Sequence, residues 1–132
     1  MITPRLLRQH KMIRTHTFIK YARLNLQEAE AALQDEDFQK VKTRCQDMAV
    51  ALLKALVAFI PGSNLDVNNA DEKTVRKLVG DLADTPHQAD SIVQKIMMIL
   101  NKKQTPDSRI GAESLYTEAG ELFQVVHDLC IT

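Results

Sequence analysis

The chain has 132 residues, enough for one domain with a buried core, and its 45% apolar and 26% charged residues are ordinary for a globular protein. Four Gly and four Pro leave little room for the many turns of an all-β fold, whereas the abundant Ala, Leu, Gln, Glu and Lys favour helices. The formal charge is zero, from 17 basic and 17 acidic residues. We therefore expect residues 1–132 to form a single all-α domain.

A first helix is predicted from about Thr3 to Leu33. Thr3 can cap it, and Pro4 suits its first turn. Apolar residues at spacings of three and four predict its buried face. These are Phe18, Ala22, Leu26, Ala29 and Leu33. The weak helix formers at 15–17 are candidates for a bend.

The second predicted helix follows a short acidic turn at 35–37, where Asp35 or Asp37 can cap it, and it ends at Pro61 and Gly62. Its apolar stripe is the clearest in the chain and consists of Phe38, Val41, Cys45, Ala49, Leu52, Leu56 and Phe59 or Ile60. Several alanines let another helix approach closely. We therefore expect this helix to be central to a bundle.

The rest of the chain predicts a loop, a short helix and two long helices. Residues 63–69 form the loop, Asp71 caps the short helix, and Val75, Leu78, Val79 and Leu82 face inward from it. A break at 84–86 precedes a helix from His87 to about Lys103, and the last helix begins near Gly111. Four long helices and one short one, joined by short loops, indicate an up-and-down helical bundle.

Charge is distributed unevenly along the chain. Residues 1–23 contain six basic residues and no acidic one, which leaves 11 basic against 17 acidic residues in 24–132. The candidate ligand- or anion-binding residues here are Arg5, Arg8, Lys11 and Arg14. A basic start suggests an anionic partner, and a solvated helix face is the alternative. Arg5 and His10 could act together on a phosphodiester, but no second pair of this kind occurs.

Two further cations are candidates. Lys54 interrupts an apolar run, where it either reaches the surface along its methylene stem or faces a groove or a phosphate. Arg109 stands just before the last helix, where it either binds a phosphate at the helix N-terminus or pairs with Asp107. Acidic residues of the last helix could instead meet the basic start of the same chain or of a second copy. These are Glu113, Glu118, Glu121 and Asp128.

Neither a metal site nor a membrane-spanning or secretory segment is expected. His87 and Asp90 share a helix face, but nothing supplies the remaining ligands. The two cysteines, Cys45 and Cys130, lack metal-like spacing and are expected to be reduced thiols in a cytoplasmic protein. The longest apolar run, 48–59, is too short to span a bilayer, and polar residues at 8–11 interrupt any signal-like segment. No cofactor is expected.

Three passages resemble one known family. Residues 22–38 resemble its first helix and the acidic turn that follows, and residues 45–56 resemble its second helix, in which a Gln, an Ala and a Leu-Lys-Ala-Leu ending recur. Residues 108–113 resemble the Arg-aromatic stretch before its last helix, with Ile110 in place of the usual Tyr. On these passages, over roughly residues 18–129, the chain resembles the HEPN domain family of nucleotide-binding helical domains.

The resemblance implies a symmetric homodimer. It also implies a binding module that partners a small nucleotidyltransferase, often as a toxin–antitoxin pair, or a metal-independent ribonuclease with an Arg and a nearby His in a late helix. This chain departs from the ribonuclease pattern, because the next His after Arg109 is His127. We therefore expect a nucleotide- or RNA-binding interaction module rather than an enzyme. A ribonuclease and a purely structural homodimeric adaptor remain as alternatives.

Overall fold

The computed structural model describes residues 4–60 and 71–131, and it describes side chains in the first helix from Met12 onward. Within these ranges the chain forms five helices and no strand. They are α1 (Pro4–Gln34), α2 (Phe38–Phe59), α3 (Glu72–Gly80), α4 (Pro86–Leu100) and α5 (Arg109–Cys130). The predicted all-α bundle of four long helices and a shorter one is confirmed.

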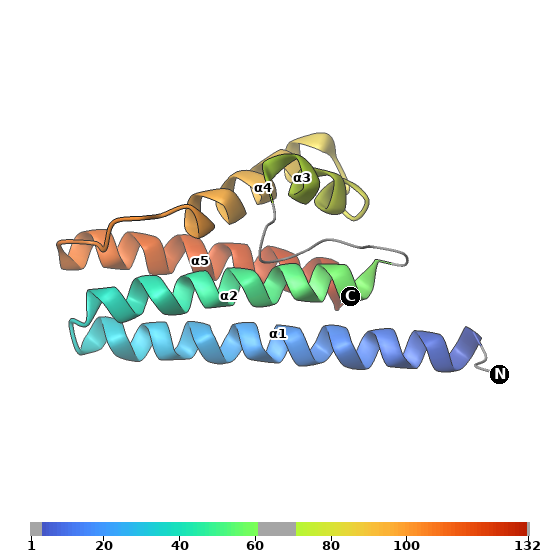
Figure 1. Ribbon diagram of the computed structural model, residues 1–132, viewed down its shortest axis with the longest axis horizontal. Coiled ribbons are helices and arrows are strands. Elements are labelled where there is room, and N and C mark those ends of the chain that lie inside the picture. The colour runs from blue at the N-terminus through green and yellow to red at the C-terminus, as the bar shows by residue number, and fades with distance from the viewer. Residues whose placement is uncertain (1–3, 61–70, 132) are drawn as a thin grey trace.

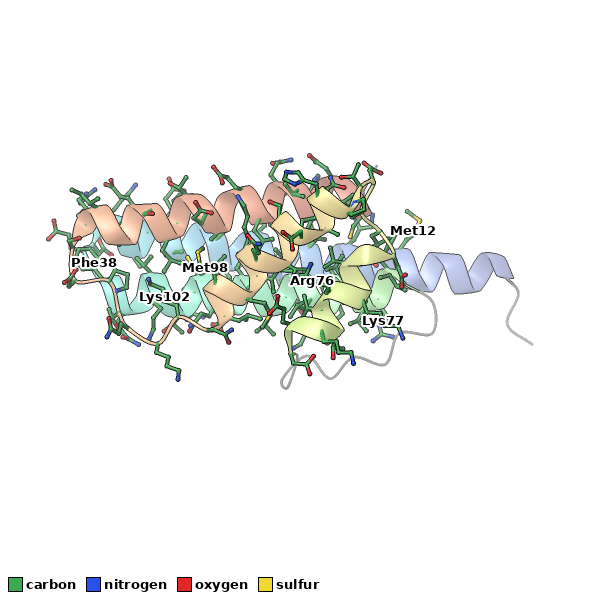
Figure 2. The ribbon with its side chains drawn as sticks, turned by 90° about the horizontal axis from the view of Figure 1, so that it is seen from above. Met12, Phe38, Arg76, Lys77, Met98 and Lys102 are labelled. Carbon is green, nitrogen blue, oxygen red and sulfur yellow. The ribbon has the colours of Figure 1, made fainter. Side chains whose placement is uncertain are left out.

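The long helices α1, α2 and α5 run side by side along the molecule, and α4 with the short α3 covers α2 and α5 (Figure 1). Among the described helices, α1 contacts only α2 and α5. Figure 2 shows α1 extending beyond the other helices on the N-terminal side of Met12. One long face of α1 is therefore covered by none of the described helices.

The core lies around α2, as its apolar stripe predicts. Val41, Cys45, Ala49 and Leu52 are all fully buried, together with residues on both sides of the stripe. The small alanines allow α1 and α5 to pack closely against this helix. Asp37, rather than Asp35, caps it, and its side chain accepts a hydrogen bond from the Lys40 backbone N–H at 3.2 Å.

The predicted bend in the first helix is wrong. α1 is continuous through residues 15–17. Thr15 points into the core and is 1% exposed, while the Thr17 hydroxyl donates to the Ile13 carbonyl at 2.8 Å within the helix. Tertiary burial outweighs the weak intrinsic helix propensity of these residues. The predicted cap at Thr3 lies outside the described residues.

Helix ends differ from the prediction around the α4–α5 loop. α4 ends at Leu100, so Lys102 and Lys103 lie beyond it rather than in its last turn. α5 begins at Arg109, two residues before Gly111, because the Ser108 side chain accepts a hydrogen bond from the Gly111 N–H at 3.1 Å.

The remaining predictions concern the segment between α2 and α3, of which the structure describes only the part from residue 71. Asp71 caps α3 as predicted, accepting from the Thr74 N–H at 2.8 Å. The predicted stop at 61–62 and the predicted loop at 63–69 lie outside the described residues. None of the helices in the described parts of the chain combines the length and the apolar character needed to cross a bilayer.

Candidate functional site

The predicted cations fall into two separate regions of the fold. Arg14 and Lys54 are exposed; Lys54 of α2 lines a groove with Phe18 of α1, and Arg14 lies four residues before Phe18. Arg109 is the first residue of α5 and lies beside Glu36, in the turn between α1 and α2. Arg5, Arg8 and Lys11 belong to the first turns of α1, but their side chains lie outside the described residues. The structure therefore places Lys54 across from the row of α1 that Arg14 continues, and it separates Arg109 from both.

Arg109 is held by carboxylates. Its guanidinium lies 3.6 Å from Glu36 in the α1–α2 turn and 3.0 Å from Glu113 one helical turn further along α5. Arg109 therefore pairs with Glu36 and Glu113 instead of the predicted partner Asp107. Glu113 is within reach because it lies four residues further along the same helix. Half of the Arg109 side chain stays exposed, but its charge is already compensated.

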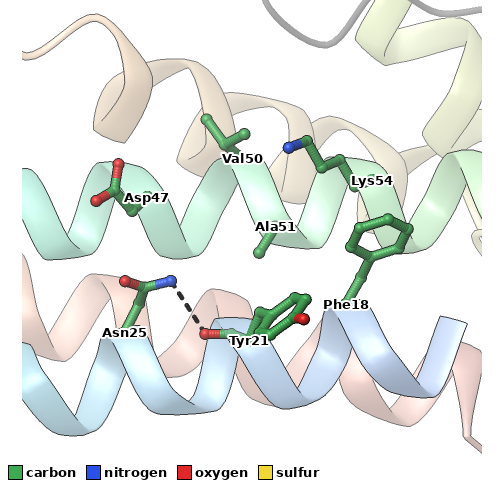
Figure 3. Close-up of a pocket in the computed structure, with 7 residues that line it drawn as sticks. All are labelled: Phe18, Tyr21, Asn25, Asp47, Val50, Ala51 and Lys54. Carbon is green, nitrogen blue, oxygen red and sulfur yellow. Dashed lines mark hydrogen bonds between the residues drawn. The ribbon is translucent and has the colours of Figure 1, made fainter. Parts of the chain in front are cut away.

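A groove lies between α1 and α2 (Figure 3). Its volume is about 300 Å³, and it is open to solvent. The lining residues are Phe18, Tyr21 and Asn25 of α1, and Asp47, Val50, Ala51 and Lys54 of α2. Of the predicted candidates whose side chains the structure describes, only Lys54 lines it.

Helical spacing explains why these side chains meet. Phe18, Tyr21 and Asn25 follow each other at three and four residues, and so do Asp47, Ala51 and Lys54 on the antiparallel neighbour. Ala51 lies between the larger side chains and has only a methyl group, so a hollow remains where two large residues would have met. Arg14 continues the α1 row one turn before Phe18.

The groove has an aromatic, cationic end and a polar end. The rings of Phe18 and Tyr21 are 6.5 Å apart and inclined by 58°. Lys54 lies across from them on α2, whereas Asn25 and Asp47 lie further along (Figure 3). The Asn25 amide donates to the Tyr21 carbonyl at 3.0 Å, which holds its side chain against α1 and leaves its oxygen available as an acceptor.

Ion pairs neutralise the acidic end of the groove but leave Lys54 available. Arg44 lies 3.3 Å from Asp47 and 2.8 Å from Glu28, so it bridges α2 to α1. Among the residues that the structure describes, Lys54 has no carboxylate partner. An anion entering the groove would therefore meet an ammonium group that no described carboxylate neutralises.

Most acidic residues of α5 do not meet the basic start of the chain within the described residues. Glu118 and Glu121 pair with Lys95 of α4 at 3.5 and 2.7 Å, and Glu113 pairs with Arg109. Asp128 contacts its neighbours on α5, His127 and Gln124. Between these acidic residues and the basic side chains described from residue 12 onward, the predicted contact inside one chain is therefore not observed. Arg23 of α1 instead contacts an aromatic ring of α5: its guanidinium lies 5.5 Å from the centre of the Phe123 ring.

Thiol and metal chemistry find no support in the described part of the chain. Burial raises the pKa of the Cys45 thiol to about 12 and that of Cys130 to about 11, so both stay protonated and unreactive at neutral pH. No group of three or more His, Cys, Asp or Glu residues there is arranged to hold a metal ion. Asp90 instead pairs with Arg76 at 2.8 Å.

Gln46, one of the residues that carry the family resemblance, has a structural contact. Its amide donates to the carbonyls of Ile99 and Lys102, at 3.3 and 2.8 Å, just where α4 ends. On the same face of α2, Lys42 donates to the Lys103 carbonyl at 3.0 Å, and Thr105 donates to the Gln39 side chain. Carbonyls at a helix end need such partners, so this polar face of α2 holds the α4–α5 loop in place.

Sequence reasoning missed Phe18 as a site residue and passed over Tyr21, Asn25 and Asp47. A signal was present, because an Arg, two aromatic residues and an amide recur at 14, 18, 21 and 25 on one helix face. No protein-family model matches this chain, and no curated protein and no solved structure shows significant similarity to it. The HEPN resemblance therefore stays a prediction.

Proposed function

We propose that this protein is a helical binding module whose α1–α2 groove takes a nucleotide, either free or as part of a single-stranded RNA. Lys54 would contact a phosphate, and Phe18 and Tyr21 would contact the base. The observation that carries the proposal is that an ammonium group without a carboxylate partner among the described residues shares one groove with two aromatic rings.

The chemistry of a nucleotide fits the two kinds of side chain. Stacking of one base on an aromatic side chain contributes about 1–3 kcal/mol and tolerates any base, since every base has a flat face. A phosphate adds a charge contact with lysine. Arg14 lies one turn from Phe18 on the same row of α1, so a longer strand would meet a second cation.

The cellular role in this proposal rests on the family resemblance. A module of this kind would act in the cytoplasm beside a small nucleotidyltransferase, as one half of a toxin–antitoxin-like pair. Co-expression with a nucleotidyltransferase encoded next to it would test that association, and the absence of a stable complex would count against it.

The groove itself is tested by titrating the purified chain with ATP, GTP and a fluorescently labelled RNA oligonucleotide. Lys54→Gln is expected to weaken binding about tenfold or more, and Tyr21→Leu severalfold, because they remove the charge and the ring separately. Lys77→Gln, which removes an exposed lysine of α3 that does not line the groove, is the matched control. Equal binding by wild type and Lys54→Gln would refute the groove as the site.

A further inference from the structure

The polar end of the α1–α2 groove presents an amide and a carboxylate from its two walls. These belong to Asn25 of α1 and Asp47 of α2, and Tyr21 lies between this end and the end with Lys54 (Figure 3). Stacking on an aromatic ring tolerates any base, and a phosphate contact carries no information about the base. Any preference of the groove for one base therefore comes from the hydrogen-bonding groups of Asn25 and Asp47.

Asp47 is held in place and can still accept further hydrogen bonds. Its Oδ2 accepts from the Arg44 guanidinium at 3.3 Å, and Arg44 is in turn anchored to Glu28 of α1 at 2.8 Å. A carboxylate has about four lone-pair sites on its two oxygens. Arg44 takes one of them, and the Asp47 side chain is 49% exposed. The carboxylate can therefore accept a pair of hydrogen bonds from a ligand in the groove.

Asn25 also has a fixed orientation. Its amide nitrogen donates to the Tyr21 carbonyl at 3.0 Å, a bond that the amide oxygen could not make, so the nitrogen and the oxygen cannot exchange places. The amide group carries two hydrogens, and this bond uses one of them. The half-buried Asn25 therefore keeps one N–H donor beside the carboxylate of Asp47.

The edge of guanine matches these two groups. Guanine carries two adjacent donors, N1–H and the 2-amino group, which a carboxylate accepts as a pair, and next to them the acceptor O6, which suits the remaining amide hydrogen. Adenine has a ring-nitrogen acceptor where guanine has N1–H, so the carboxylate would face a lone pair. Uracil and cytosine each have a single donor group on this edge. The pairing of a carboxylate with an amide donor therefore favours guanine.

The spacing along the groove fits a single nucleotide. Asp47 and Lys54 are seven residues apart on α2, which is about 10 Å at a rise of about 1.5 Å per residue. A nucleoside monophosphate bridges such a distance from the edge of its base to its phosphate. Between the two ends, Tyr21 lies across from Val50 and Ala51. A base there would lie between an aromatic ring and two apolar side chains.

We propose that the α1–α2 groove selects guanine nucleotides and that Asp47 is the residue that determines this specificity. The proposal rests on the nucleotide site proposed above and adds the identity of the base. Asp47 accepts from N1–H and the 2-amino group, and Asn25 donates to O6. Tyr21 stacks on the base, while Lys54 contacts the phosphate at the other end of the groove.

NMR titration of the full chain with GMP, AMP, IMP and XMP tests the choice of base. The wild type should bind GMP about tenfold or more tightly than AMP, and IMP, which lacks the 2-amino group, should bind severalfold more weakly than GMP. Asp47→Asn replaces one acceptor by a donor, which suits the 2-oxo group of xanthine, so this variant should bind XMP more tightly than GMP. Asp107→Asn, at an exposed loop position that does not line the groove, is the matched control.

Lys54→Gln separates failure of this proposal from failure of the nucleotide site itself. It should weaken GMP and AMP by the same factor, whereas Asp47→Asn should change the ratio of their affinities. Equal affinity of the wild type for GMP and AMP, both weakened by Lys54→Gln, would overturn the guanine preference and leave the nucleotide site standing. No binding of any nucleotide would overturn both. An equal loss for every base in Asp47→Asn would mean that Asp47 acts through Arg44 on the shape of the groove, and would overturn its role in choosing the base.

Discussion

α1 and α2 pack against each other, but they differ in how many of their sides are covered. α2 contacts all four other helices, and nine of its 22 residues are buried. α1 contacts two helices and presents exposed Ile13, Tyr21 and Leu24 to solvent. Apolar residues in α2 therefore stabilise the fold, whereas several apolar residues of α1 are available for binding.

The largest difference between the two helices is expected in the free energy of unfolding when one leucine in each is replaced by alanine. Leu52→Ala in α2 removes a fully buried side chain and should lower the free energy of unfolding by about 3–4 kcal/mol. Leu24→Ala in α1 should lower it by about 0.5 kcal/mol or less, because that residue is 45% exposed and loses little buried area. Urea unfolding followed by circular dichroism measures both. Similar losses would contradict the contrast between a covered and an uncovered helix.

The polar face of α2 gives the second largest effect. Gln46→Ala removes both hydrogen bonds to the end of α4 and leaves partly buried carbonyls without these donors, so we expect a loss of about 1–2 kcal/mol. Gln124→Ala on α5 is the control, since its amide makes an exposed hydrogen bond to Asp128. Hydrogen exchange should quicken after Leu100 in the first variant alone. Unchanged exchange there would mean that Gln46 does not hold the loop.

Burial in α2 also predicts a pH effect. Burial disfavours the thiolate and raises the pKa of Cys45 in the folded protein to about 12, from its ordinary value of 9.0. From about pH 9 upward, the unfolded chain loses this proton while the folded chain keeps it. This thiol's contribution to stability is therefore complete below pH 9 and is lost as pH rises toward 12.

The slope of that loss is at most about 1.4 kcal/mol per pH unit. Unfolding curves of wild type and Cys45→Ala at pH 8 to 10.5 isolate it from other titrating groups, and the wild type should lose stability faster with pH. Parallel curves would show that Cys45 exchanges its proton as easily in the folded as in the unfolded protein.

The covered and uncovered parts of the molecule also differ in how well sequence predicts them. Periodicity located all five helices and most of the α2 core, because a buried face imposes a spacing on apolar residues. It misjudged Thr15, whose burial depends on α1 packing as a whole. It also extended α4 too far. That helix ends where the Gln46 side chain of α2 donates a hydrogen bond to the Ile99 carbonyl, and these two residues are 53 positions apart in the sequence.

Site prediction was weaker for a related reason. Lys54 stood out because it interrupts an apolar run, but Tyr21 and Asn25 acquire their position only when α2 lies beside them. Arg109 looked equally promising, since the sequence near it does not reveal that Glu36 of a distant turn approaches its guanidinium. These neighbours are brought together by tertiary contacts, so the local spacing of residues in the sequence does not predict them.

The smallest expected effect on stability comes from replacing Arg109, and it distinguishes Arg109 from Lys54. Arg109→Ala should change the free energy of unfolding by about 0.5 kcal/mol or less, because exposed ion pairs contribute little. It should also leave nucleotide binding unchanged, since Arg109 contacts Glu36, just beyond the end of α1 at Gln34, and Gln34 lies about 24 Å along the helix from Phe18, given a rise of about 1.5 Å per residue. Titration of Arg109→Ala beside Lys54→Gln checks this. A loss of affinity in Arg109→Ala that equals the loss in Lys54→Gln would move the binding site to the N-terminus of α5, and would mean that the groove between α1 and α2 is not where this protein recognises its ligand.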